Sequence, residues 1–272
     1  MNDQDSLSEQ GPCVLSEDSG HVRWLTLNRP ARRNPLSLEM ITTLEAGFAK
    51  AYEDASVRVI VLSAAGPVFS AGHDLQEMGS HAGSETERVA RQRKILDACA
   101  AMMLSIMRGP KAVIASVAGI ATAAGCQLVS ACDLALASDQ ARFATPGVNI
   151  GAFCTTPLVN IGRKIHRKHA MQMALTGELI SAQDAYRFGL VNQVVPLRYL
   201  REETEKLAQL IAGKSAQAIA TGKRAFYEQI DMPVEEAFAY ATREMIAGTR
   251  TDDAKEGSRA FFEKRPPAWS VP

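Results

Sequence analysis

The chain has 272 residues, of which 46% are hydrophobic and 22% charged, and its 30 basic and 30 acidic residues give a formal net charge of zero. This composition is typical of a globular protein. The balanced charge argues against nucleic acid or an anionic membrane surface as a partner. Five scattered cysteines without a C-x-x-C pair indicate a reducing compartment, and they favour neither a disulfide framework nor a zinc site.

Residues 1–12 are predicted to be a disordered tail. The stretch Met1 to Gly11 is polar and acidic, and it resembles neither a secretory signal nor an Arg-rich transit peptide. No apolar run reaches the roughly 18 residues that a membrane span requires. We therefore predict a cytoplasmic protein that has no membrane partner.

Strands are predicted to alternate with helices in the first half of the chain. The β-branched and aromatic runs Val22–Leu27 and Val57–Leu62 are typical of strands. Ser37 is a suitable N-cap for a helix that runs through Tyr52. A second helix is predicted over Glu87–Met107, followed by a strand over residues 112–117. Each helix has one apolar stripe, which is expected to pack in the core: Met40, Leu44, Phe48 and Tyr52 in the first, and Ile95, Cys99, Met102 and Ile106 in the second.

One pattern, a strand followed by a small-residue turn and a helix start, occurs twice, at Val68–Met78 and at Ser116–Val129. Small residues at such a junction let another molecule approach the backbone. The first N–H groups of a helix point outward without an internal partner, so an oxygen that gains negative charge can bind there. A tight crossing of helix and sheet without any ligand is the alternative.

Beyond these junctions, short strands are predicted over Asp133–Ala137, Arg142–Ala144 and Leu190–Val195, and a helix over Lys164–Leu175. Only helices are predicted from residue 197 onward. This order predicts an α/β core over residues 13–196 and a C-terminal helical region over residues 197–272.

Four segments of the chain resemble the enoyl-CoA hydratase/isomerase family, the crotonases. They are L-N-R-P-A-R-R-N-P-L-S from Leu27, F-S-A-G-H-D-L from Phe69, V-A-G-I-A-T-A-A-G-C-Q-L from Val117, and T-G-E-L-I-S-A-Q-D-A-Y-R-F-G-L-V-N-Q-V-V-P from Thr176. Each motif is of modest specificity by itself, but their order and spacing match over roughly residues 20 to 265.

The resemblance implies a spiral of ββα turns, and C-terminal helices that form a homotrimer or a dimer of trimers. It also implies an acyl-CoA thioester as substrate, without a metal ion or a redox cofactor. Two backbone N–H groups hold the thioester oxygen in this family, and they match His73 and Ala124 here. The positions that match contacts to the CoA moiety are Arg32, Arg33, Asp74, Leu75, Phe261 and Lys264.

The chain departs from the family at the two glutamates with which a hydratase activates water. Gln127 stands at the first of these positions and Gly147 at the second. A glutamine cannot exchange protons near neutral pH, and a glycine has no side chain. Because general acid–base catalysis contributes about 10²–10⁴-fold, their absence argues against hydration by the two-glutamate route.

Five residues near the expected acyl site are candidates for other chemistry: His73, Cys126, Gln127, Cys154 and Thr155. Cys154 is a nucleophile or base if its pKa is depressed, and otherwise a small buried residue. His73 either transfers a proton or lines the pocket. The sequence therefore predicts an acyl-CoA-processing enzyme of the family, and the alternative is a non-catalytic acyl-CoA-binding or scaffold subunit.

Overall fold

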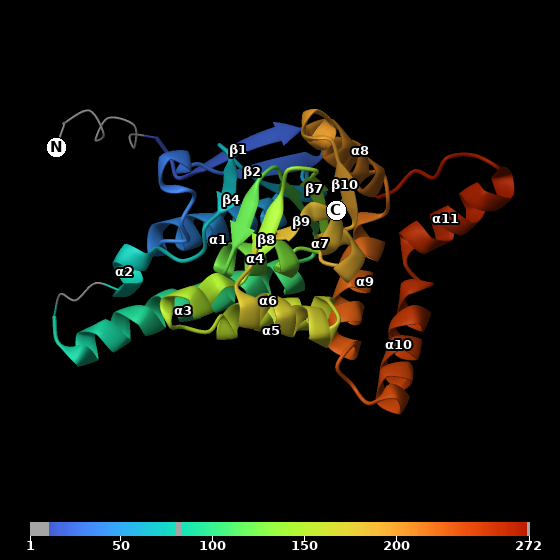
Figure 1. The fold of residues 1–272 in the computed structure, drawn as a ribbon. Coiled ribbons are helices and arrows are strands. Elements are labelled where there is room, and N and C mark those ends of the chain that lie inside the picture. The colour runs from blue at the N-terminus through green and yellow to red at the C-terminus, as the bar shows by residue number, and fades with distance from the viewer. Residues whose placement is uncertain (1–10, 80–82, 271–272) are drawn as a thin grey trace.

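A computed structural model describes residues 11–79 and 83–270 of the chain (Figure 1). The predicted N-terminal tail lies outside the described residues, except for its last two. Ser80, the first residue of a polar segment between two predicted helices, also lies outside them. No helix within the described residues is long and apolar enough to cross a membrane.

The larger of two sheets has six strands in the order β1-β2-β3-β5-β7-β10. Strands β1 and β2 form an antiparallel pair, and every other neighbouring pair in this sheet is parallel. Its strands are β1 (Val14–Ser19), β2 (Val22–Leu27), β3 (Val59–Ala64), β5 (Ala112–Val117), β7 (Leu134–Ser138) and β10 (Gln193–Val195).

The smaller sheet has four short strands in the order β4-β6-β8-β9. The strand pairs β3/β4, β5/β6 and β7/β8 each place one strand in the larger sheet and the next strand in the smaller sheet, before the chain continues into helical structure. These repeats form the predicted spiral of ββα turns. The strands of the smaller sheet are β4 (Val68–Ser70), β6 (Ile120–Thr122), β8 (Arg142–Ala144) and β9 (Ile180–Ser181).

Helices cover both faces of the larger sheet. On one face, Trp24 and Val61 pack against α8 through Leu200 and Ala208, all of them buried. On the other face, the predicted apolar stripes of α1 and α3 lie in the main core. The helices of the core are α1 (Leu38–Glu53), α2 (Leu75–Gly79), α3 (Glu85–Arg108), α4 (Ala124–Ala131), α5 (Thr155–Lys164), α6 (Arg167–Thr176), α7 (Ala182–Phe188) and α8 (Leu200–Ala212), with short 3₁₀ turns η2 (Pro30–Arg32), η3 (Pro146–Ile150) and η4 (Leu197–Tyr199).

Several helix starts are capped by a serine or threonine side chain. The hydroxyl of Ser37 accepts a hydrogen bond from the N–H of Met40, and Ser84 forms a complete capping box with Glu87. The helix predicted over residues 164–175 is confirmed by α6 for most of its length, but α6 begins three residues later, because α5 ends at Lys164 and the helical backbone is interrupted at Ile165 and His166.

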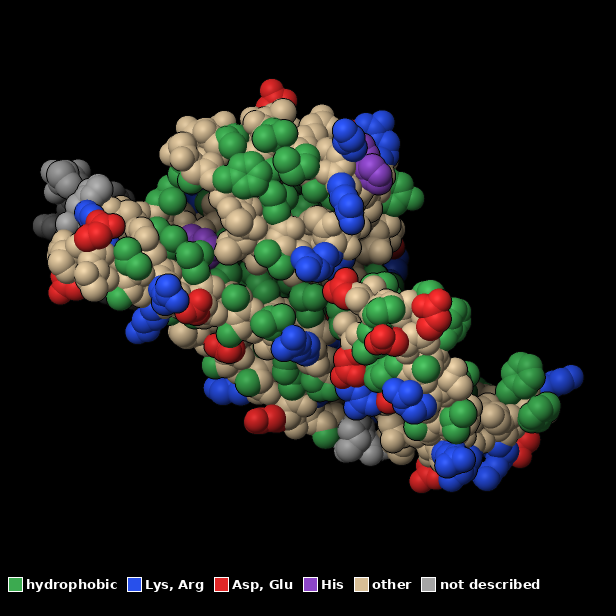
Figure 2. Space-filling view, turned by 90° about the horizontal axis from the view of Figure 1, so that it is seen from below, with side chains coloured by type: hydrophobic (Ala, Val, Ile, Leu, Met, Phe, Trp, Pro, Cys, Tyr) green, Lys and Arg blue, Asp and Glu red, His purple; other side chains and the backbone are tan. Residues whose placement is uncertain are grey.

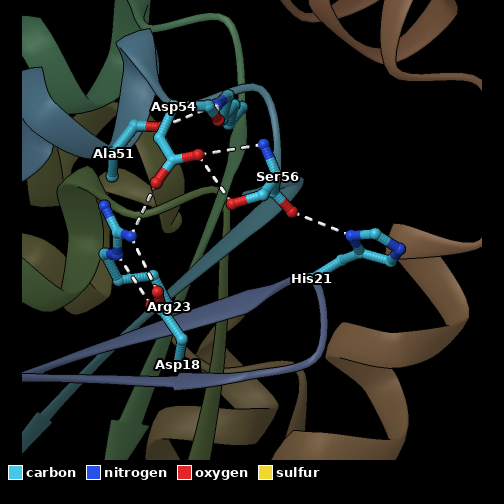
Figure 3. A network of polar contacts seen from close by, with 7 residues as sticks. Asp18, His21, Arg23, Ala51, Asp54 and Ser56 are labelled. Atoms are coloured by element: carbon cyan, nitrogen blue, oxygen red, sulfur yellow. Dashed lines mark hydrogen bonds and ion pairs between the residues drawn. The ribbon is translucent and has the colours of Figure 1, made fainter. Parts of the chain in front are cut away.

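Arg23 fastens the antiparallel edge of the larger sheet to the end of α1 (Figure 3). Its guanidinium donates to Asp18 at 2.7 Å and to Asp54 at 2.8 Å. Asp54 also accepts hydrogen bonds from the N–H and the hydroxyl of Ser56, and Nδ1 of His21 lies 2.8 Å from the Ser56 carbonyl oxygen. These contacts fix the β1–β2 hairpin against the next turn of the spiral.

The C-terminal helices extend from the core as an arm (Figures 1 and 2). Its first helix is held by Lys223, whose Nζ donates to Asp133 at 2.6 Å and to the carbonyl oxygens of Ile106 and Lys111. Tyr227 donates to the same carboxylate at 3.2 Å. Asp133 therefore anchors the arm to the core. The helices of the arm are α9 (Ala216–Gln229), α10 (Val234–Gly248) and α11 (Asp252–Glu263).

Candidate active site

The two strand–turn–helix junctions found in the sequence touch each other. Strands β4 and β6 pair in parallel, so the turns that follow them lie side by side. A Cβ atom on Gly72 would lie 2.9 Å from the Cβ of Ala123 and 3.1 Å from the nitrogen of Ala124. A Cβ atom on Gly125 would lie 2.4 Å from the carbonyl oxygen of Ser70. Glycine is therefore required at both contacts, and no side chain separates the two turns.

The N–H groups of His73 and Ala124 have no acceptor among the described residues. The N–H of Leu36 donates to Gly72 and that of Asp74 donates to Leu36, which leaves the His73 N–H on the side facing away from Leu36. Ala124 is the first residue of α4, so its N–H lacks an acceptor within the helix. Both donors are free to bind an oxygen atom of a ligand.

The turn that presents Ala124 has an unusual backbone conformation. Ala123 has φ +49° and ψ −121°, a combination that residues with a Cβ rarely adopt. Its N–H donates to the carbonyl oxygen of Ala144 at 2.9 Å, which holds the turn against β8. Such strain is found where a site is held in one geometry by the surrounding structure.

Unsatisfied polar atoms gather around this turn. Four buried side-chain atoms in the described parts of the chain lack a hydrogen-bond partner, and three of them belong to His73, Gln127 and Thr145. Gln127 lies one turn into α4, and Thr145 follows the residue that accepts from Ala123. Buried polar groups are normally paired, so these atoms indicate that a ligand or water binds here. Burial lowers the pKa of His73 from its ordinary value of 6.5, which keeps its ring neutral.

The positions of the expected glutamates have different surroundings. Gln127 is buried, and its Nε2 donates to Oδ1 of Asn160 at 3.1 Å. Gly147 lies in η3, and a Cβ atom there would lie 3.0 Å from the sulfur of Cys154 and 3.1 Å from its nitrogen. A side chain at position 147 requires this neighbour to move.

Cys154 precedes α5 and is 8% exposed. Its sulfur accepts a hydrogen bond from the N–H of Gly147 at 3.3 Å. Burial raises the pKa of its thiol above the ordinary value. A raised pKa leaves little thiolate at neutral pH, which favours packing over nucleophilic catalysis.

The residues matched to CoA contacts fall into two groups. The side chain of Arg32 donates to Asp74 at 2.8 Å and to Gln76 at 3.2 Å. Arg32 and Asp74 line a hollow of about 570 Å³ together with Arg91 and Lys94 of α3. The two further members of this group follow Arg32 and Asp74 in the chain: Arg33, which has a left-handed backbone, and Leu75, which is 64% exposed.

The second group lies elsewhere in the single chain. Phe261 is 78% exposed on α11, and Lys264 caps the end of that helix. Figure 1 shows α11 at the opposite side of the molecule from α2. One protomer therefore does not bring the two groups together.

Two residues of the site were not found from the sequence. Thr145 is a single polar residue at the end of a short strand, and Asn160 lies within a helix that the sequence did not predict. Both are buried, at 0% and 5% exposure. An isolated Thr or Asn carries no local signal that separates a buried site residue from a surface one.

Known proteins of one family match most of the chain. The family model for enoyl-CoA hydratase/isomerase matches residues 17–271. Enoyl-CoA hydratase domain-containing protein 3, mitochondrial, of Danio rerio is 44% identical over 257 residues, which cover 94% of this chain and 87% of that protein. A crystal structure of an enoyl-CoA hydratase from Mycobacterium smegmatis matches with a TM-score of 0.90 and 46% identity, and the match covers 95% of this chain and 99% of that one.

The comparison corrects one prediction. The relative from Homo sapiens is 42% identical over 97% of this chain and 85% of its own length. Both this relative and the one from Danio rerio are named mitochondrial, so the prediction of a cytoplasmic protein is wrong. All five cysteines are free and buried. By its family match, its relatives and its fold, the chain belongs to the enoyl-CoA hydratase/isomerase family.

Proposed function

We propose that this protein binds an acyl-CoA thioester and processes it as an enzyme, with the thioester oxygen held by the N–H groups of His73 and Ala124. The observation that supports the proposal most is that both N–H groups lack an acceptor in the described chain, while their turns touch at Gly72. Donors aimed at an oxygen that gains charge stabilise an enolate or a tetrahedral intermediate, and removing one typically lowers turnover about 10²–10³-fold.

The proposed reaction is one that does not use two glutamates as acid and base. Gln127 and Gly147 cannot transfer protons, and burial keeps the ring of His73 neutral by lowering its pKa. Hydration and isomerisation by a glutamate are therefore less well supported than decarboxylation or thioester hydrolysis, in which a polarised carbonyl supplies much of the effect. We propose no metal or redox cofactor, and unchanged turnover in the presence of EDTA is the check.

Binding and turnover are to be measured on the same preparation. Calorimetric titration with butyryl-CoA tests whether the thioester binds, and a panel of enoyl-, malonyl- and saturated acyl-CoA substrates tests the reaction. Turnover of one substrate class supports the enzyme. Binding without turnover supports the alternative, a non-catalytic acyl-CoA-binding or scaffold subunit, for which the loss of both carboxylates is the motivation. Absence of binding would contradict both.

Restoring the two glutamates tests whether their absence limits hydration. Gln127→Glu together with Gly147→Glu restores both carboxylates, but a Cβ at position 147 meets the Cys154 sulfur at 3.0 Å. We therefore expect crotonyl-CoA hydration to rise more when Cys154→Gly is added to the double variant. High hydration by the unmodified protein would contradict the roles assigned to Gln127 and Gly147.

We also propose a homotrimer or a dimer of trimers formed through the arm. Large apolar side chains are exposed on its helices, and Figure 2 shows hydrophobic side chains on its surface. Such surfaces mark sites of association. A partner subunit's arm could also bring Phe261 and Lys264 toward the hollow at Arg32. Sedimentation equilibrium gives the assembly, and a monomer at micromolar concentration would contradict the proposal. The most exposed of these side chains are Phe238, Met245, Phe261 and Phe262.

A further inference from the structure

The side-chain amide of Gln127 forms a hydrogen bond through its nitrogen but not through its oxygen. The side chain is 4% exposed, and its Nε2 donates to Asn160 at 3.1 Å, but its Oε1 has no donor among the described residues. A buried acceptor left without a donor destabilises a protein, so a ligand group that donates to it is favoured. Helical side chains lean toward the start of their helix, and Ala124, the proposed oxyanion donor, lies three residues before Gln127 in the first turn of α4.

The direction of the Gln127 amide is set from outside the site. Asn160 is 5% exposed, and its Nδ2 lies 3.2 Å from the sulfur of Met107. A thioether is only an acceptor, so the NH₂ group of Asn160 must face Met107 and its oxygen must face Gln127. That oxygen in turn requires the NH₂ group of Gln127. The hydrogen bonds from Gln127 to Asn160 and from Asn160 to Met107 can therefore form in only one direction. If the Asn160 amide were reversed, its oxygen would face the Met107 sulfur, and both atoms are acceptors.

We propose that Asn160 is a positioning residue that fixes Gln127 with its carbonyl oxygen toward the acyl group, so that the site favours acyl groups bearing a hydroxyl over those bearing a carbonyl at the same carbon. This inference rests on the proposed function, because it requires an acyl-CoA thioester whose oxygen lies at the Ala124 N–H. A hydroxyl donates to Oε1, whereas a carbonyl brings a second acceptor toward it. A glutamine can hold such a hydroxyl without removing its proton.

The test compares two CoA thioesters that differ only at C3, 3-hydroxybutyryl-CoA and acetoacetyl-CoA. The quantity measured is the ratio of their Kd values by calorimetry, and each variant is compared with the unmodified protein, so that contributions from the oxyanion donors cancel. In Asn160→Leu the Gln127 amide is free to turn its NH₂ group toward the ligand. We expect this variant to shift the ratio about three- to tenfold toward acetoacetyl-CoA, the change typical of one hydrogen bond.

Two further variants separate positioning from a merely structural role. Asn160→Asp keeps an oxygen toward Gln127 in either protonation state, so it should retain the ratio of the unmodified protein. Met107→Leu removes the acceptor that orients Asn160, so it should shift the ratio in the same direction as Asn160→Leu. Thermal unfolding confirms that each variant is folded, and a structural role alone would change the unfolding temperature but not the ratio.

The outcomes distinguish this inference from the proposed function. If neither thioester binds to the unmodified protein, the proposed function fails first. If both bind but the ratio is the same in Asn160→Leu, then Asn160 does not orient Gln127 and the inference is overturned. The inference would also be overturned if Asn160→Asp shifted the ratio of Kd values as much as Asn160→Leu does. The loss of the Asn160 amide, and not of its oxygen, would then account for the shift.

Discussion

Replacing Gly72 by alanine is expected to separate the two turns that carry the proposed oxyanion donors. Gly72 has φ +92°, and a Cβ atom would lie 2.9 Å from that of Ala123 and 3.1 Å from both the Ala124 nitrogen and the Thr122 carbonyl oxygen. The left-handed backbone contributes about 1–3 kcal/mol of strain, and overpacking contributes about 1–3 kcal/mol more. The free energy of unfolding should therefore fall by about 2–6 kcal/mol.

Two measurements check this expectation for Gly72→Ala. Thermal unfolding should occur roughly 4–24 °C lower, since about 1 kcal/mol corresponds to 2–4 °C in a chain of this size. Calorimetric titration with butyryl-CoA should show at least a tenfold weaker affinity, because the His73 N–H moves away from that of Ala124. The control is Gly162→Ala in α5, where a Cβ meets nothing within 4 Å, so both quantities should be kept or improved. Unchanged affinity in folded Gly72→Ala would refute the two-donor site.

Three other perturbations test the surroundings of the site. Asp133→Ala should destabilise the fold by about 3–5 kcal/mol, because Lys223, only 7% exposed, would keep a buried charge without its carboxylate; chemical denaturation should show a smaller loss when Lys223→Met is added. Ala123→Gly should stabilise the protein by about 1 kcal/mol in the same assay, since the strain at φ +49° exceeds the entropy that glycine adds to the unfolded chain; a loss of stability would contradict the strained turn. The pKa of His73 is lowered in the folded state, so the unfolded chain binds the proton first as the pH falls below about 6.5. Stability should then decrease with falling pH by at most about 1.4 kcal/mol per pH unit until the folded pKa is reached, and His73→Gln should reduce this slope in a urea titration repeated from pH 7.5 to 5.

The order of strands and helices was predictable from the sequence because it is encoded locally. The runs at β2, β5 and α1 have the right residues for their element, and Ser37 marks a helix start that the structure confirms. Helix α5 was missed because Pro157 and Gly162 interrupt its pattern, and it is followed by the break at Ile165. Tertiary packing decided this segment, since Ile161 and Asn160 are buried against α4.

In the candidate site, too, the features encoded locally were predictable, and those that depend on distant residues were not. The small-residue turns at Gly72 and Ala123 were visible because a close approach of two backbones leaves its mark on the residues themselves. The anchoring role of Asp133 was not visible, because its partner Lys223 lies 90 residues away on another helix. Polar residues whose roles depend on a distant partner cannot be read from their own surroundings in the chain.

The chemistry of this site depends on the orientation of Gln127 as well as on the missing glutamates. A glutamine in place of a glutamate removes a base, but its effect on a ligand depends on which end of the amide faces the site. That end is decided 33 residues further along the chain at Asn160, and again at Met107, 53 residues before Asn160. Substituting Gln127 therefore changes a hydrogen-bonded chain of three residues, and a variant such as Gln127→Glu tests the acid–base role only when the response of Asn160 is measured with it.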